Sequence, residues 1–170
     1  MRMRFRKLLP SLIALILGAV SVPAQGPTLV FKGTDGSQVS GAALKGKVVV
    51  LCFGATWVPM SAKQLPAIQK LAASYPDAKV FWVSVNPSRQ GAANSMNDAD
   101  LAAYASRNGL KIPVLRDAER SAYKTLGLNS LPTTVVLDKD GVVKSRYEGF
   151  DPDQADPFSE VAQMISSLLK

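Results

Sequence analysis

The sequence predicts a single α/β domain built on a mixed β-sheet that is flanked by helices. Two runs of apolar and β-branched residues, at 48–53 and 80–85, are typical of strands buried on both faces. A segment with helical periodicity follows each run. The C-terminal part of the chain has the pattern of a β-hairpin followed by a last helix. The 170 residues suit one domain with a substantial hydrophobic core.

The first half of the domain begins with short elements and leads into the first long strand. Residues 28–32 alternate in polarity and predict a short strand, which Asp35-Gly36 ends in a turn. Residues 42–47 predict one helical turn directly before the buried strand at 48–53.

A helix over 59–74 follows that strand. Pro59 suits the first helical position, where the missing N–H costs little, and Pro66 falls inside the helix and should kink it. The residues expected on its inner side are Leu65, Ile68, Leu71 and Tyr75.

The middle of the chain predicts a second buried strand, a loop and a helix. Residues 80–85 form the strand, and 86–97 are polar and small, as in a surface loop. Asp98 is the expected N-cap of the next helix and Gly109 its C-terminal stop. The residues expected on the inner face are Leu101, Tyr104 and Ala105.

The last third predicts an extended piece at 112–115, a short helix at 121–126 and a hairpin. The hairpin strands, 133–137 and 142–147, flank the turn sequence Asp-Lys-Asp-Gly. A final helix follows, with Asp156 as its cap and Pro157 at its first position. Its apolar positions have a period of 3.6 and are Phe158, Val161, Ala162, Ile165, Leu168 and Leu169.

The N-terminus has the layout of a secretory signal peptide. A short basic stretch precedes an apolar run at 8–20, and Val22 and Ala24 fit the small-residue rule for cleavage before Gln25, with a cut after Ser21 as the competing choice. We therefore expect residues 1–24 to be a signal peptide and 25–170 to be an exported domain, periplasmic or secreted. The alternative is an uncleaved N-terminal anchor, which would be the domain's sole link to a membrane.

The composition excludes several classes of chemistry, because the chain has one cysteine and no histidine. One thiol cannot form an internal disulfide or a Cys-x-x-Cys pair. Zinc sites of the Cys/His kind and Ser-His-Asp triads lack their ligands and bases. We expect no metal and no cofactor.

The net charge of +7 does not indicate nucleic-acid binding. Four of the 20 basic residues lie in the first seven positions, which leaves 16 basic and 13 acidic residues, or +3, in the remainder. That remainder contains no stripe of Lys and Arg.

Several segments, in this order along the chain, resemble the thioredoxin fold, specifically its TlpA-like or redoxin (AhpC/TSA-like) branch. The segments are the strand lead-in at 45–50, the strand and helix start at 50–61, the helix proline Pro66, the loop at 127–134 and the turn at 138–141. The resemblance covers residues 27–170 and implies a cis-proline at Pro132.

The chain departs from this family at its catalytic motif. Where the family has Trp-Cys-x-x-Cys, this sequence reads Trp57-Val58-Pro59-Met60-Ser61. The family's chemistry needs a thiolate at the helix N-terminus and a second thiol to release the mixed disulfide. Val58 has no nucleophile and Ser61 has no base to activate it, so the chain is expected not to be a thiol–disulfide oxidoreductase by that mechanism.

Cys52 is the alternative route to activity. It lies within the apolar strand, where burial raises the pKa of a thiol and makes it inert. A small core residue is the plainer interpretation, and a redox thiol that retains some oxidoreductase or antioxidant activity is the competing one.

The function expected is a non-catalytic module that binds an unidentified protein or peptide at the former active-site groove. In the family this surface receives an extended peptide beside the cis-proline. The residues expected to bind are Trp57, Val58, Pro59, Met60, Leu131 and Pro132. An inert remnant of a catalytic site is the other interpretation.

Overall fold

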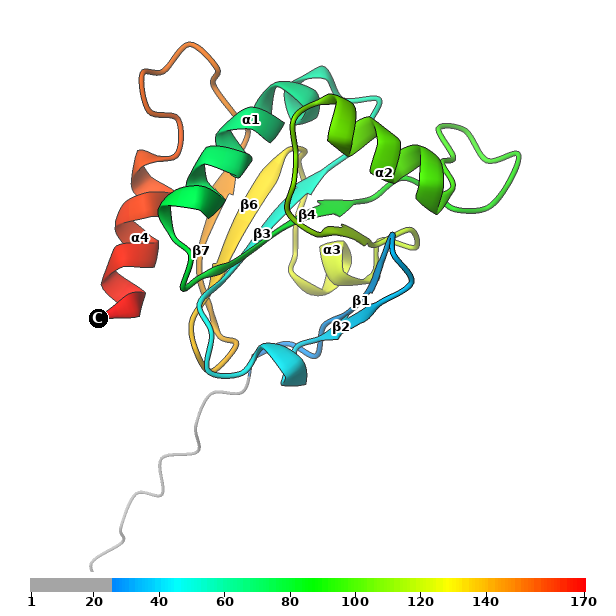
Figure 1. The fold of residues 1–170 in the computed structure, drawn as a ribbon. Coiled ribbons are helices and arrows are strands. Elements are labelled where there is room, and N and C mark those ends of the chain that lie inside the picture. The colour runs from blue at the N-terminus through cyan, green and yellow to red at the C-terminus, as the bar shows by residue number, and fades with distance from the viewer. Residues whose placement is uncertain (1–25) are drawn as a thin grey trace, which may run out of the picture.

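A computed structural model describes residues 26–170, so the expected signal peptide at 1–24 lies outside the described residues. Seven strands form one mixed sheet in the order β2-β1-β5-β4-β3-β6-β7 (Figure 1). The strands are β1 (Val30–Gly33), β2 (Gln38–Ser40), β3 (Val49–Gly54), β4 (Lys79–Ser84), β5 (Val114–Arg116), β6 (Thr133–Leu137) and β7 (Val143–Glu148). The helices are the 3-10 turn η1 (Ala42–Leu44), α1 (Pro59–Ser74), α2 (Asp98–Arg107), α3 (Ser121–Thr125) and α4 (Ser159–Leu169).

Strand β3 lies inside the sheet between β4 and β6 and is buried along its whole length. It pairs in parallel with β4 and antiparallel with β6, so the expected mixed sheet is confirmed. Strand β2, which the sequence analysis did not predict, pairs antiparallel with β1 through the turn at Gly36, where φ is +84°.

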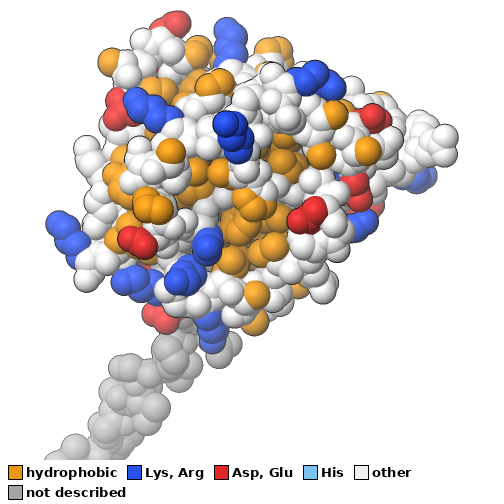
Figure 2. Space-filling view, in the orientation of Figure 1, with side chains coloured by type: hydrophobic (Ala, Val, Ile, Leu, Met, Phe, Trp, Pro, Cys, Tyr) orange, Lys and Arg blue, Asp and Glu red, His pale blue; other side chains and the backbone are white. Residues whose placement is uncertain are grey.

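The core has two halves, because alternate residues of β3 point to opposite faces of the sheet. On one face Val50 and Cys52 pack with the inner sides of α1, α2 and α4. On the other face Leu51 and Phe53 pack with β1, the hairpin strand β6 and α3. In space-filling view, apolar side chains gather in the middle of the visible face and charged ones lie mostly around them (Figure 2).

Two predicted helix caps are wrong. The N-cap of α2 is Asn97, whose side-chain oxygen accepts from the Asp100 N–H at 2.8 Å, because Asp98 is turned toward other partners. Helix α4 begins at Ser159, two residues after Pro157, and its N-cap Phe158 makes no side-chain capping bond. Asp156 contributes its backbone carbonyl to the Ser159 N–H at 3.1 Å.

Helices α1, α2 and α3 agree with the predicted ranges to within two residues at their ends, while the helical turn predicted at 42–47 is the shorter η1, which ends at Leu44. Helix α1 spans Pro59–Ser74, with Leu65, Ile68 and Leu71 buried and Pro66 inside it. Within residues 26–170, no helix is long and apolar enough to cross a bilayer.

Candidate functional site

The site begins where β3 ends and the chain turns into α1. The Val58 N–H donates to the Ala55 carbonyl at 3.1 Å, and the Ser61 N–H donates to the Val58 carbonyl at 2.9 Å. Val58 is the N-cap of α1 with an extended backbone and no side-chain capping bond, and Pro59 follows at the first helical position. The aligned nucleophile position therefore lies at the helix N-terminus and carries an isopropyl group.

The aligned position of the second thiol holds a buried hydroxyl. Ser61 is 0 % exposed, and its Oγ accepts from the Ala55 N–H at 3.1 Å. Gly54 makes room for this arrangement, since a Cβ there would lie 3.1 Å from the Ser61 Oγ and 2.7 Å from the Trp82 Nε1. The hydroxyl thus stabilises the turn before α1, and among residues 26–170 its Oγ makes no hydrogen bond to a side chain that could act as a base.

Asn86 anchors the same turn from the end of β4. Its Oδ1 accepts from the Thr56 N–H at 3.1 Å, and its Nδ2 donates to the Thr56 Oγ1 at 2.7 Å and to the Asn94 carbonyl at 2.9 Å. Asn86 is fully buried. Asn86 was not predicted as a site residue, because the polar composition of 86–97 indicated a surface loop. The available signal was a polar side chain directly after a buried strand.

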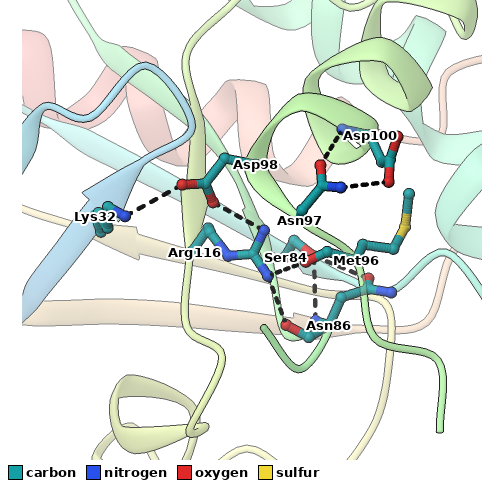
Figure 3. A network of polar contacts seen from close by, with 8 residues as sticks. All are labelled: Lys32, Ser84, Asn86, Met96, Asn97, Asp98, Asp100 and Arg116. Atoms are coloured by element: carbon teal, nitrogen blue, oxygen red, sulfur yellow. Dashed lines mark hydrogen bonds and ion pairs between the residues drawn. The ribbon is translucent and has the colours of Figure 1, made fainter. Parts of the chain in front are cut away.

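A second network holds the loop that leads into α2 (Figure 3). Arg116 at the end of β5 is buried, and its Nη2 donates to the Met96 carbonyl at 2.7 Å and to the Asn86 carbonyl at 3.3 Å. Its Nη1 lies 3.0 Å from the Asp98 Oδ1, and the Asp98 Oδ2 lies 3.1 Å from the Lys32 Nζ. This contact is why Asp98 does not cap α2.

Cys52 is buried, as expected from its strand. Its side chain is 0 % exposed, and burial raises the pKa of the thiol to about 12. The Thr134 Oγ1 lies 3.8 Å from the Cys52 Sγ and accepts from the Gln64 Nε2 at 3.3 Å. At neutral pH the thiol is therefore protonated and shielded, which makes it a poor nucleophile.

The residues expected to bind a partner differ in exposure. Trp57, Val58 and Leu131 are half-buried and pack against one shared core cluster. Met60 is half-buried outside that cluster, and Pro59 is exposed. We call Trp57, Val58, Pro59, Met60 and Leu131 the former active-site surface.

Pro132 is buried and cannot present its ring to a partner. The Leu131–Pro132 peptide bond is cis, and the Pro132 carbonyl accepts from the Gly149 N–H at 2.8 Å. Among residues 26–170 the backbone N–H and C=O of Leu131 have no hydrogen-bond partner. A buried proline thus precedes β6, and the half-buried Leu131 before it has peptide groups without a partner among residues 26–170.

Arg120 borders the former active-site surface, and it too was not predicted as a site residue from the sequence. Its Cζ lies 5.8 Å from the centre of the Trp57 ring. Its neighbour Tyr123 donates its hydroxyl to the Ser130 carbonyl at 3.1 Å, and burial raises the pKa of that hydroxyl, with Arg120 acting in the opposite direction. The sequence separation between Arg120 and Trp57 gave no indication that the two side chains are in contact.

Two hollows of about 460 and 480 Å³ in the described part of the chain lie along α4 and the β7–α4 connection. Within residues 26–170 there is no group of three His, Cys, Asp or Glu side chains close enough to hold a metal ion. The residues of the former active-site surface are apolar and are exposed or half-buried, which suits contact with an extended segment.

The sheet order, the helix that starts after β3 and the proline before β6 define a thioredoxin-fold protein. The chain belongs to the Redoxin family, whose family model matches residues 21–165. It has a single cysteine where active members have a pair, so its catalytic site is degenerate.

Curated relatives and solved structures agree with this assignment. The chain is 27% identical to the thiol-disulfide oxidoreductase ResA of Bacillus thuringiensis strain Al Hakam over 132 residues, 76% of this chain and 71% of the relative. It is 31% identical to the thioredoxin-like protein YneN of Bacillus subtilis strain 168 over 125 residues, 74% of this chain and 70% of the relative. The exposed lipoprotein thioredoxin Etrx1 of Streptococcus pneumoniae TIGR4 superposes with a TM-score of 0.65 at 27% identity, covering 81% of this chain and 98% of the other.

A more distant structure shows the same fold. A secreted disulfide oxidoreductase of Mycobacterium tuberculosis superposes with a TM-score of 0.64 at 20% identity, covering 82% of this chain and 96% of the other.

Proposed function

We propose that this protein is an exported, non-catalytic member of the Redoxin family that binds an extended peptide segment at the former active-site surface. The observation that carries the proposal is the contrast between the thiol positions and their surroundings. Val58 carries no nucleophile, the Ser61 hydroxyl is buried in a bond to Ala55, and Cys52 is fully buried. Trp57 and Leu131 nevertheless remain half-exposed beside them.

The chemistry of the family supports loss of catalysis at this site. Exchange requires a thiolate that attacks one sulfur of a disulfide and a second thiol that resolves the mixed disulfide. Neither position supplies sulfur, and a pKa of about 12 keeps Cys52 protonated near neutral pH. Binding needs no thiol, so it is the part of the family's function that these residues can retain.

The peptide backbone of Leu131 supports an extended ligand. An added strand gains affinity by pairing its own N–H and C=O groups with unpaired ones, and it gains specificity from alternate side chains. The N–H and C=O of Leu131 have no partner within residues 26–170, and the half-buried Trp57 and Val58 border the same core cluster. One ligand strand could satisfy the peptide groups of Leu131 and cover these apolar side chains.

The proposed location rests on the N-terminal pattern and on relatives. Residues 1–24 have the basic, apolar and small-residue segments of a signal peptide. Two proteins with the same fold are described as exposed and as secreted.

A direct binding measurement tests the proposal. We expect carbamidomethylated insulin B chain, an unfolded peptide with its thiols blocked, to bind the immobilised protein in biolayer interferometry. Trp57→Ala should weaken this binding about tenfold or more, because a central aromatic side chain commonly supplies much of the affinity of an interface.

Val30→Ala is the matched control for Trp57→Ala. Val30 is an apolar residue of β1 with 49 % of its surface exposed, and the change should leave binding within twofold. Equal loss in both variants, or no binding by the unaltered protein, would show that the surface is an inert remnant.

A further inference from the structure

Arg120 places a positive charge at the Trp57 end of the former active-site surface. Its Cζ lies 5.8 Å from the centre of the Trp57 ring, within the range of a cation–π contact. Arg120 is exposed while Trp57 is half-buried. The ring thus has an apolar surface for a ligand and a guanidinium beside it.

The backbone conformation of Arg120 fixes the position from which its charged side chain extends. Arg120 has φ +55° and ψ +33°, a left-handed conformation that is uncommon for residues other than glycine. Its N–H donates to the Asp117 carbonyl at 2.9 Å, and its own carbonyl accepts from the Lys124 N–H at 3.0 Å. Arg120 is therefore held between the end of β5 and helix α3.

No acidic group forms an ion pair with Arg120 in the described part of the chain, although Arg120 and Glu148 both act on the Tyr123 hydroxyl. The ion pairs recorded there join Lys32 and Arg116 to Asp98, and Lys144 to Asp138. Glu119 is exposed and makes no ion pair within 4.0 Å, and Glu148 accepts from the Ser130 Oγ at 3.0 Å. The five guanidinium N–H groups of Arg120 also have no hydrogen-bond acceptor within residues 26–170.

We infer that the former active-site surface selects extended peptides in which a carboxylate side chain lies close to an apolar one. The apolar side chain covers Trp57 and Leu131, and the carboxylate pairs with Arg120, whose planar fork matches carboxylate geometry. This inference rests on the proposed function and adds the chemical class of the ligand.

Nine end-blocked hexapeptides test the inference. They share an apolar sequence in which one residue, at the third, fourth or fifth position, is replaced by Glu, Gln or Lys. In isothermal titration calorimetry at low salt, the best Glu peptide should bind about two- to fivefold more tightly than its Gln counterpart. This is the difference in affinity expected from a largely exposed ion pair. The Lys peptide should be the weakest.

Two changes should remove this preference. Arg120→Asn deletes the charge with a residue that tolerates the left-handed conformation, so the Glu and Gln peptides should then bind equally. About 1 M NaCl should have the same effect on the unaltered protein, because it shortens the screening length to about 3 Å. Arg107→Asn, an equal loss of charge in the last turn of α2, should keep the preference.

The outcomes separate this inference from the proposed function. Equal binding of the Glu and Gln peptides to the unaltered protein, or a preference that survives Arg120→Asn, overturns the inference while insulin B chain still binds. If the hexapeptides fail to bind although insulin B chain binds, the inference is also overturned. If neither kind of peptide binds, the proposed function fails as well.

Discussion

Ser61 and Cys52 both carry a buried polar atom that has a structural role in this protein, and only Ser61 stands at a position aligned with a catalytic thiol. The Ser61 Oγ satisfies the Ala55 N–H, which would otherwise be a buried donor without a partner. Cys52 packs as a small apolar residue and makes one long contact to the Thr134 hydroxyl at 3.8 Å. Neither residue is exposed, so neither can meet a disulfide in solution without local unfolding.

The thiol of Cys52 gives a prediction about reactivity. A disulfide reagent should label native Cys52 at a rate set by unfolding, since the side chain is fully buried and burial raises its pKa to about 12. Labelling in denaturant at the same pH is the reference, and we expect it to be complete at least about a hundredfold sooner. Labelling that is equally fast in the native protein would restore Cys52 as a candidate redox thiol.

The same pKa predicts how stability depends on pH. The folded thiol titrates near 12 and a thiol in the unfolded chain near 9.0, so the unfolded state loses its proton first. The stability that the protonated thiol contributes is complete below pH 9 and falls as the pH rises toward 12. Urea unfolding of the protein and of Cys52→Ala should show the variant gaining relative stability between pH 8 and about pH 10.5, while tyrosine and lysine titration affects both alike.

At the scale of elements, two neighbouring residues at the start of α2 have different roles, one in capping the helix and one in ion pairing. Asn97 caps the helix, and Asp98 pairs with the buried Arg116 and with Lys32. Sequence analysis assigned the cap to Asp98 because Asn and Asp are equally good caps and stand side by side. The buried cation that draws Asp98 away lies on β5, distant in the sequence, so local patterns could not reveal it.

The two residues should respond differently to substitution. Asn97→Ala should lower the free energy of unfolding by about 1 kcal/mol, the usual cost of a lost cap. Asp98→Asn should cost about 1–3 kcal/mol, because it leaves the buried Arg116 guanidinium without its carboxylate, although partial exposure of Asp98 reduces the penalty. Urea denaturation measures both, and a neutral Asn97→Ala beside a costly Asp98→Asn would contradict the assignment of the cap.

At the scale of the whole molecule, the sequence was informative about the fold and less so about the site. The buried runs of β3 and β4, the helix at Pro59–Ser74 and the hairpin β6–β7 follow from hydrophobic patterns and turn residues, which act locally. The contacts of Arg120 with Trp57 and of Asn86 with Thr56 join residues far apart in the chain. Their partners depend on tertiary packing and leave no periodic signal in the sequence.

The whole fold also sets how the degenerate site can be tested. Helix α1 starts at Pro59, with Val58 as its N-cap and Ser61 buried one turn on. Because the scaffold around these two positions is that of the family, Val58→Cys together with Ser61→Cys should form a reducible disulfide and return thiol chemistry to the helix N-terminus.

Insulin reduction by dithiothreitol, followed as turbidity, is the most direct measurement of whether the site has lost catalysis. The unaltered protein should not exceed the blank containing dithiothreitol alone, and the Val58→Cys, Ser61→Cys variant should exceed it clearly in the same assay. Turnover by the unaltered protein, abolished by Cys52→Ala, would contradict a non-catalytic site and assign the activity to the buried thiol.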